Sequence, residues 1–243
     1  MPLFRRPGFP RRSPDPPERS TASDEDVPVS DNQLEERAEE LLLPGFRTMQ
    51  ETVDALREEF ELDDDDPRPS RTVASVRRAR LAEQESWAGA SDHDRLVEAF
   101  RTLGEMGIVG RMAFACCQTC GTAEIDDERT ADPDAWPEAY PWREWGYTFF
   151  HEQDADRLAT EPADLYLTFS TWRPAPGLAP ELLTRARNGD DDARREVFRE
   201  SDARVGQQVA DAVRRVGLEV DWSGDPAQRI AVRVDRWRRR LPD

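Results

Sequence analysis

The stretch IVGRMAFACCQTCGTAEI, residues 108–125, carries all three cysteines of the chain directly after an apolar run. Residues 108–115 have the length and composition of a buried strand. Residues 121–129 are typical of a short helix or turn. The pattern therefore predicts a strand that leads three thiols into one turn, and the rest of the chain can be placed around it.

Four more segments have the alternating apolar and polar pattern of strands: residues 146–150, 164–170, 218–222 and 229–234. The last two flank Ser223-Gly-Asp-Pro226 and predict a terminal hairpin. Helical spacing of apolar residues predicts helices at 31–43, 46–60, 70–88, 91–104, 153–159, 180–187, 191–200 and 202–216. Helices interleaved with strands and a closing hairpin predict an α+β fold, with a mixed or antiparallel sheet of about five strands and packed helices.

Breaks in composition divide the chain into four parts. Residues 1–29 are rich in Pro, Ser and charged residues and predict a disordered tail, because they bury too little to offset chain entropy. Residues 30–62 form an N-terminal helical segment. The acidic and proline-rich residues 63–69 are expected to be a solvated linker. Residues 70–240 then form the α+β domain, and the closing WRRRL is expected to be a solvated, cationic end.

The composition restricts the partners. The chain has 51 acidic and 34 basic residues, all of the latter arginine, and a net charge of −17. Such a field opposes binding to nucleic acid and to anionic lipid, since both require neutralising cations. A basic partner protein fits this charge better. No pattern identifies a small-molecule substrate.

The cysteine count and the N-terminus both favour a cytoplasmic protein. Pro7, Gly8 and Pro10 interrupt the apolar core that a signal peptide needs, and no run approaches the length of a membrane span. Three cysteines in a cytoplasmic chain indicate thiols or a metal site rather than a disulfide framework.

Cys117-Gln-Thr-Cys120-Gly121 has the spacing of a zinc knuckle, in which the glycine can adopt a positive φ. Cys116 is expected to point to the opposite face from Cys117, as neighbours in an extended segment do. A structural zinc site needs four ligands. His151, at the end of the strand 146–150, is the best third protein ligand if that strand runs parallel to 108–115. The remaining oxygen ligands to consider are Glu124 and Asp154.

Other interpretations use the same residues. A C-x-x-C between a strand and a helix also suits redox chemistry, because a helix N-terminus lowers the pKa of the first thiol. Cys117 with His151 as base would make a nucleophile. In the plainest interpretation, the three thiols simply pack a tight turn. Asp154 also suits the N-terminal cap of the helix that follows, and His93 has the surroundings of a surface residue.

Four segments together resemble an uncharacterised domain family of GC-rich bacteria: FACCQTCGTAEI, GYTFFHEQD, DLYLTFS and VGQQVADAVRRVGLEVDWSGDPAQRI. The resemblance spans residues 92–240. It implies a domain of cytoplasmic bacterial proteins. It implies no activity, substrate, cofactor or catalytic residue, so an enzymatic role stays open.

Overall fold

The computed structural model describes residues 29–135 and 140–243. In chain order the described elements are α1 (Asp31–Leu42), α2 (Met49–Glu59), α3 (Arg68–Gln84), α4 (Asp92–Glu105), β1 (Ile108–Arg111), α5 (Gln118–Glu124), η1 (Ile125–Glu128), β2 (Gly146–Phe149), α6 (Glu152–Ala155), η2 (Asp156–Ala159), β3 (Ala163–Thr171), α7 (Pro180–Arg187), α8 (Asp191–Arg215), β4 (Glu219–Asp221) and β5 (Ile230–Val234). Among these helices, none is long and apolar enough to cross a bilayer. The predicted tail of residues 1–29 lies, except for Val29, outside the described residues.

The described strands form one five-stranded sheet in the order β1-β2-β3-β5-β4. β1 pairs with β2 in parallel, with Ile108 opposite Gly146 and Arg111 opposite Phe149. All other neighbours are antiparallel, and β4 with β5 forms the predicted hairpin. The prediction of an α+β fold with a mixed sheet is thus confirmed.

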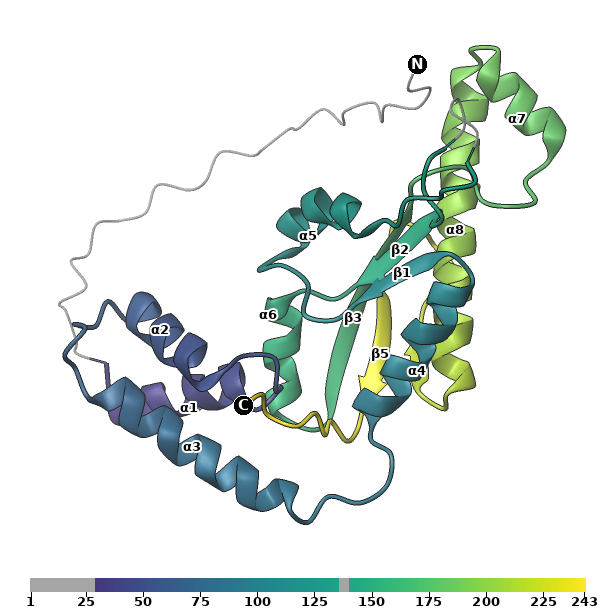
Figure 1. The fold of residues 1–243 in the computed structure, drawn as a ribbon. Coiled ribbons are helices and arrows are strands. Elements are labelled where there is room, and N and C mark those ends of the chain that lie inside the picture. The colour runs from purple at the N-terminus through teal and green to yellow at the C-terminus, as the bar shows by residue number, and fades with distance from the viewer. Residues whose placement is uncertain (1–28, 136–139) are drawn as a thin grey trace.

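The two faces of the sheet carry different layers (Figure 1). α4 and α8 pack on one face, where most of the apolar core lies. α5 and η1 lie on the other face over β1 and β2, where Val109, Ile125, Tyr147 and Phe149 form a smaller apolar cluster. Alternation along β2 explains the division, because Gly146 meets Val205 of α8 while Phe149 meets Gly121 of α5.

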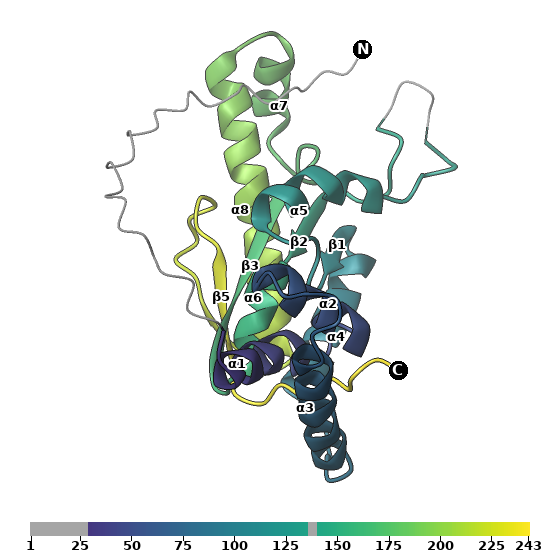
Figure 2. The same cartoon turned by 90° about the vertical axis from the view of Figure 1, so that its left-hand side faces the viewer.

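Helices α1, α2 and α3 form a separate lobe with an apolar cluster of its own, which includes Leu34, Leu56 and Val73. Ser30 and Thr48 start α1 and α2 with capping boxes. Figure 2 shows the lobe beside the lower end of the sheet domain. Residues 63–67 lie between α2 and α3, within this lobe, and Arg68 and Pro69 form the start of α3. The linker and domain division expected at 63–69 stay predictions.

Trp237 connects the lobe to the sheet domain. Its side chain is fully buried, donates a hydrogen bond from Nε1 to the Pro44 carbonyl at 3.0 Å, and contacts the rings of Phe46 and Phe150. The expectation of a solvated WRRRL end is therefore wrong for Trp237. Nothing in the local sequence reveals its partners, since Pro44 lies 193 residues away.

Two predicted element boundaries also differ. The strand expected at 108–115 ends at Arg111, because the chain turns at Ala113 and Ala115, which have positive φ angles of 46° and 57°. The two helices expected at 191–200 and 202–216 are one continuous helix, α8. Ser201, at the expected break between them, is buried within α8 and accepts the amide hydrogen of Ala175.

Candidate thiol and metal site

The loop between β1 and α5 is held against the chain that follows β2. The amide of Phe114 donates to the carbonyl of Phe150 at 2.9 Å, and the amide of Glu152 donates to that of Ala115 at 3.0 Å. The parallel pairing of β1 with β2 therefore continues as backbone contact beyond the strand ends. Residues in the left-handed region are costly without glycine, so Ala113 and Ala115 mark a loop whose shape is imposed by its surroundings.

This loop brings all three cysteines together. The sulfurs of Cys116, Cys117 and Cys120 lie within 4.8 Å of one another, with Cys116 exposed and the other two half-buried. We call this group the thiol cluster. The expectation that Cys116 points away from Cys117 is wrong, because the turn at Ala115 replaces the extended strand on which that expectation depended. Cys116 is thus the site residue that sequence reasoning missed.

Hydrogen bonds give the thiols different acidities. Cys117 is the N-cap residue of α5, and the amide of Cys120, followed by the Cys120 side chain, holds the pKa of its thiol below the ordinary value. The Cys120 thiol donates to Cys116 and Cys117, and these contacts raise its pKa to about 12. The cluster therefore gives up its first proton readily and retains the proton of Cys120.

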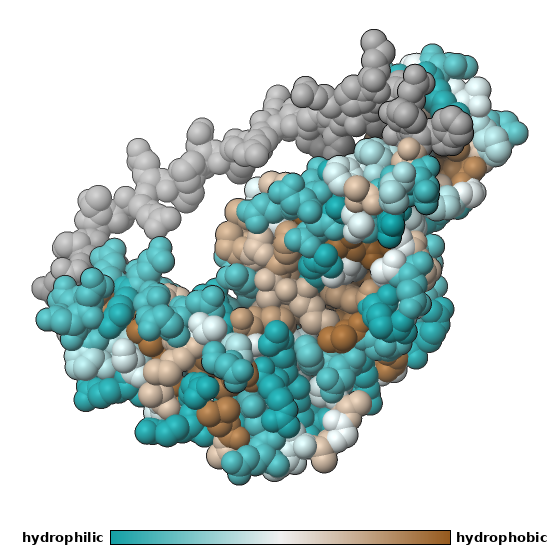
Figure 3. Space-filling view, viewed as in Figure 1, coloured by the Kyte–Doolittle hydropathy of each residue, from teal (hydrophilic) through white to brown (hydrophobic). Residues whose placement is uncertain are grey.

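Gly121 allows α5 to pack closely against the sheet. A Cβ atom at this position would lie 2.6 Å from a ring carbon of Phe149, which only glycine avoids. Gly121 does not have a positive φ, so its role differs from that of a knuckle glycine. In Figure 3 hydrophobic atoms gather below α5. Phe114 and Trp172 pack against the smaller apolar cluster. The thiol cluster thus sits on a packed platform.

The structure does not bring His151 into the thiol cluster. Its side chain caps α6, with Nδ1 accepting the Asp154 amide hydrogen at 3.2 Å and Nε2 lying 3.0 Å from Oδ2 of Asp154. Among described residues the three cysteines are the only group of three or more His, Cys, Asp or Glu whose ligand atoms are this close. Glu124 is exposed at the end of α5.

Asp154 belongs to a buried polar network instead. Its carboxylate forms an ion pair with Arg229, which also donates to the Tyr166 carbonyl. Since Nδ1 of His151 accepts a hydrogen bond, Nε2 must carry the proton that faces Asp154. Burial lowers the pKa of His151, so the ring is neutral in this arrangement. The cap role expected of Asp154 belongs to His151.

A hollow separates the α1–α3 lobe from the sheet domain near this loop (Figure 3). It has a volume of about 370 Å³, and its lining includes Phe46, Met112, Ala113 and Glu152. Arg47 forms an ion pair with Glu152 across it at 2.6 Å. Burial raises the pKa of Asp156 at its edge. The hollow adjoins the loop that carries the thiol cluster through Ala113 and Glu152.

Comparisons with known proteins identify a family for this chain but no individual relative. Neither the curated proteins nor the solved structures include a match to the chain. One family, described as a domain of unknown function, matches residues 28–241, which take in the lobe, the sheet and the thiol cluster. The match starts just before α1 and ends after Trp237, the residue that joins lobe and sheet. The chain therefore belongs to the DUF6891 family, whose domain has no assigned function.

Proposed function

We propose that the thiol cluster binds a zinc ion. The observation that supports this function is the mutual approach of three sulfurs to within 4.8 Å. Zinc–sulfur bonds of about 2.3 Å in a tetrahedron place sulfurs about 3.8 Å apart, so small side-chain shifts convert the cluster into three zinc ligands. Soft thiolates select zinc and copper(I) over magnesium and calcium.

The protonation of the cluster fits this proposal. Cys120 retains its proton because it lies beside the other two sulfurs, which carry negative charge when ionised. A bound cation takes the place of that proton and relieves the repulsion among thiolates. Three protein ligands leave the fourth position of a tetrahedral zinc ion for water or a further ligand.

His151 stays the predicted protein ligand for the fourth position. It lies directly after β2, and the residues beside it on both sides are bonded to the loop that carries the cysteines. To reach a metal, its ring must turn away from Asp154. Zinc affinity of a His151→Gln variant tests this role separately from the thiols.

The proposal is tested by titrating the reduced, chelator-treated chain with Co²⁺ and then displacing the Co²⁺ with Zn²⁺. Three thiolates give Co²⁺ an intense sulfur-to-metal absorption that one or two cannot match. We expect one metal ion per chain. Cys116→Ser, Cys117→Ser and Cys120→Ser should each weaken binding by about 100-fold, since each removes one of a few strong ligands.

His93→Gln is the matched control for His151→Gln, because His93 is the only other histidine of the chain. It should leave metal affinity unchanged. A tightly bound metal ion whose affinity survives Cys117→Ser would contradict the proposal, and so would a reduced chain that binds neither Co²⁺ nor Zn²⁺.

Reversible disulfide exchange between Cys117 and Cys120 is a second candidate function. It is favoured by the lowered pKa of Cys117, since a thiolate is the attacking species in such exchange. Oxidation of the metal-free chain followed by peptide mapping would then yield a Cys117–Cys120 disulfide with Cys116 free. A chain that forms this disulfide reversibly but binds no metal would support the second function over the first.

Both functions need reduced thiols, which supports a cytoplasmic location for the protein. The acidic composition continues to favour a basic partner protein over nucleic acid. That partner stays a prediction. Pull-down with immobilised basic and acidic proteins at low and physiological salt would test it.

A further inference from the structure

A pocket with a cationic lining lies far from the thiol cluster in sequence, at the start of α4. It has a volume of about 420 Å³ and is formed by the loop after α3, the first turn of α4 and the C-terminal segment 238–240. Three consecutive arginines line it, namely Arg238, Arg239 and Arg240. We call it the arginine pocket. Cavities of this size hold small molecules of roughly nucleotide size.

The charge of the arginine pocket contrasts with that of the molecule. The whole chain has a net charge of −17, yet Arg238, Arg239 and Arg240 form no ion pair with any described residue. Asp94 is the only carboxylate in the lining. Glu83 lies nearby but is already paired with Arg80 at 2.8 Å. The pocket therefore has a surplus of positive charge.

Two residues of the lining have lowered pKa values, Arg239 and His93. Arg239 is half-buried: its guanidinium donates to the Gly45 carbonyl and lies 4.6 Å from the Phe46 ring centre, and burial lowers its pKa. The charge of Arg239 adds to burial in lowering the pKa of His93 on the opposite wall. An anion between these groups would offset both effects, because it interacts favourably with each cation.

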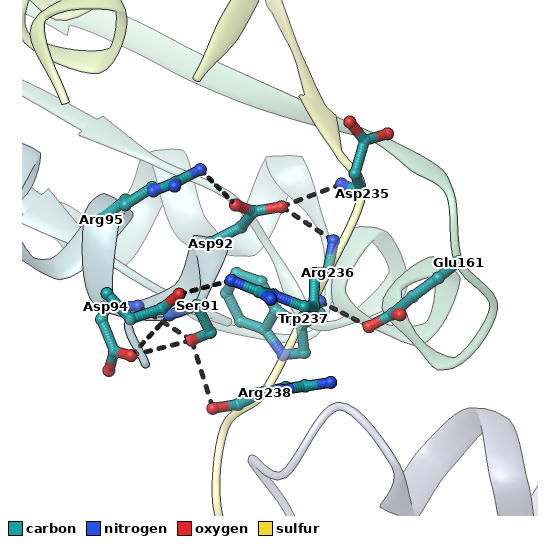
Figure 4. A network of polar contacts seen from close by, with 10 residues as sticks. Ser91, Asp92, Asp94, Arg95, Glu161, Asp235, Arg236, Trp237 and Arg238 are labelled. Atoms are coloured by element: carbon teal, nitrogen blue, oxygen red, sulfur yellow. Dashed lines mark hydrogen bonds and ion pairs between the residues drawn. The ribbon is translucent and has the colours of Figure 1, made fainter. Parts of the chain in front are cut away.

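The backbone around the pocket is held in place. Figure 4 shows Ser91 donating to the Arg238 carbonyl, at 3.3 Å, while Asp92 accepts the amides of Asp235 and Arg236. The neighbouring Trp237 is fully buried. The backbone that carries the arginines is thus held by hydrogen bonds, and binding a ligand does not require this segment to become ordered first.

We propose that the arginine pocket binds a small molecule through a phosphate or pyrophosphate group. Guanidinium groups match phosphate oxygens with paired hydrogen bonds. Arg238 and Arg240 can offer such pairs here, while Arg239, whose guanidinium donates to the Gly45 carbonyl, adds its charge. Asp94 offsets one of the three arginine charges in the lining, and a divalent anion would balance the positive charge that remains. The net charge of the chain repels a nucleic acid, whose many phosphates extend beyond one pocket, but it acts weakly on a small ligand inside it. The indole of Trp87 forms a wall that an organic part of the ligand can contact.

The experiment is calorimetric titration of the intact chain with inorganic phosphate and with pyrophosphate, using sulfate for comparison. We expect saturable binding at one site, tighter for pyrophosphate. Arg238→Gln and Arg240→Gln should each weaken pyrophosphate binding by about tenfold or more, since each removes a charge-assisted contact. Asp94→Asn should strengthen it, because it removes the carboxylate and keeps an oxygen to accept the Ser91 amide.

Arg195→Gln is the matched control, because it removes the same charge from an exposed site on α8. Circular dichroism of every variant checks that the fold is retained. The proposal is overturned if neither phosphate nor pyrophosphate binds, or if Arg195→Gln weakens binding as much as Arg238→Gln. Binding of heparin or RNA without binding of pyrophosphate would also overturn it and would show a surface for large polyanions.

Discussion

The thiol of Cys117 stands at the N-terminus of α5, where the amide of Cys120, and to a lesser extent that of Thr119, lowers its pKa. Its neighbour Cys120 is the donor in both of its contacts with the other sulfurs. The two residues belong to one C-x-x-C motif and have opposite pKa shifts. Their acidity is therefore set by hydrogen-bond direction, which spacing alone does not reveal.

Alkylation of the metal-free chain should reflect this difference. We expect iodoacetamide to modify Cys117 with a pH midpoint below the roughly 8.5 of a free thiol, and Cys120 most slowly, because its pKa is raised to about 12. Mass spectrometry of the digested chain measures each site. Cys117→Ser should remove the low-pH phase, and faster labelling of Cys120 than of Cys117 would contradict the assignment.

The two histidines predict how stability changes with pH. Burial lowers the pKa of both His93 and His151 in the folded chain, below the roughly 6.5 of the unfolded chain. The unfolded chain then binds protons first as the pH falls through 6.5, so the folded state loses stability on acidification. The loss is at most about 1.4 kcal/mol per pH unit for each histidine.

Urea unfolding between about pH 7.5 and 5.5 measures this loss. Asp156 has a raised pKa and acts in the opposite direction, so the comparison with His93→Gln and His151→Gln decides the test. Each variant should show a shallower fall in stability than the unsubstituted chain. Unchanged slopes in both variants would contradict the expected contribution of the histidines.

At the scale of elements, the sequence predicted every described strand and the positions of most helices. Alternation and capping patterns are local, and Ser30, Thr48 and Ser91 cap their helices with the neighbours beside them. The errors occurred where a contact with a residue distant in sequence determines where an element begins or ends. The sequence predicted a break at Ser201 within α8, and the hydrogen bond that its buried side chain accepts from Ala175 is invisible in the sequence.

The same limit applies to the candidate site. The C-x-x-C spacing identified Cys117 and Cys120, and the parallel alignment of β1 with β2 is the arrangement on which the approach of His151 depended. The sequence could not show that a left-handed turn at Ala115 redirects Cys116. It also could not show that the His151 ring faces Asp154, or that Asp154 is itself paired with Arg229.

Helix α8 and the β4–β5 hairpin approach each other at Gly206. A Cβ there would lie 2.6 Å from a ring carbon of Trp222 and 2.8 Å from one of Phe169. Gly206→Ala should therefore destabilise the fold by about 1–3 kcal/mol, although alanine is the better helix former. Thermal unfolding followed by circular dichroism measures the change.

Gly104 of α4 provides the control. A Cβ at Gly104 meets no atom within 4 Å, so Gly104→Ala should stabilise the chain by up to about 1 kcal/mol. If Gly206→Ala and Gly104→Ala stabilise the chain equally, α8 does not pack closely on the hairpin at Gly206.

At the scale of the whole molecule, Trp237 should be a principal source of cohesion between lobe and sheet. Trp237→Ala removes a fully buried indole and the hydrogen bond to Pro44, so we expect a loss of about 3–5 kcal/mol in the free energy of unfolding. Trp87→Ala, at a half-buried indole, should cost less. Equal losses would show that Trp237 has no special role in joining the two parts.

The division at residues 63–69 predicts that a chain beginning at Ser70 keeps the sheet domain folded. The main core on the α4–α8 face contains no fully buried residue from α1 or α2. Such a chain exposes Val73 and Val76 of α3 and leaves Trp237 without Phe46, so it should melt cooperatively at a lower temperature. Aggregation without a cooperative transition would assign the first two helices to the folding unit.

Trp237 also has a consequence for biosynthesis. The hydrogen bond from its indole to Pro44 joins residues 193 positions apart, so a ribosome that has just made Pro44 must add nearly all of the remaining domain before the contact can form. At about 5 to 20 residues per second this takes about 10 to 40 s. During that interval the nascent chain contains the three-helix lobe but lacks Trp237, the residue that packs the lobe against the sheet domain. The docking surface of the lobe is then open to chaperones, and the lobe can dock only after Trp237 has left the ribosome.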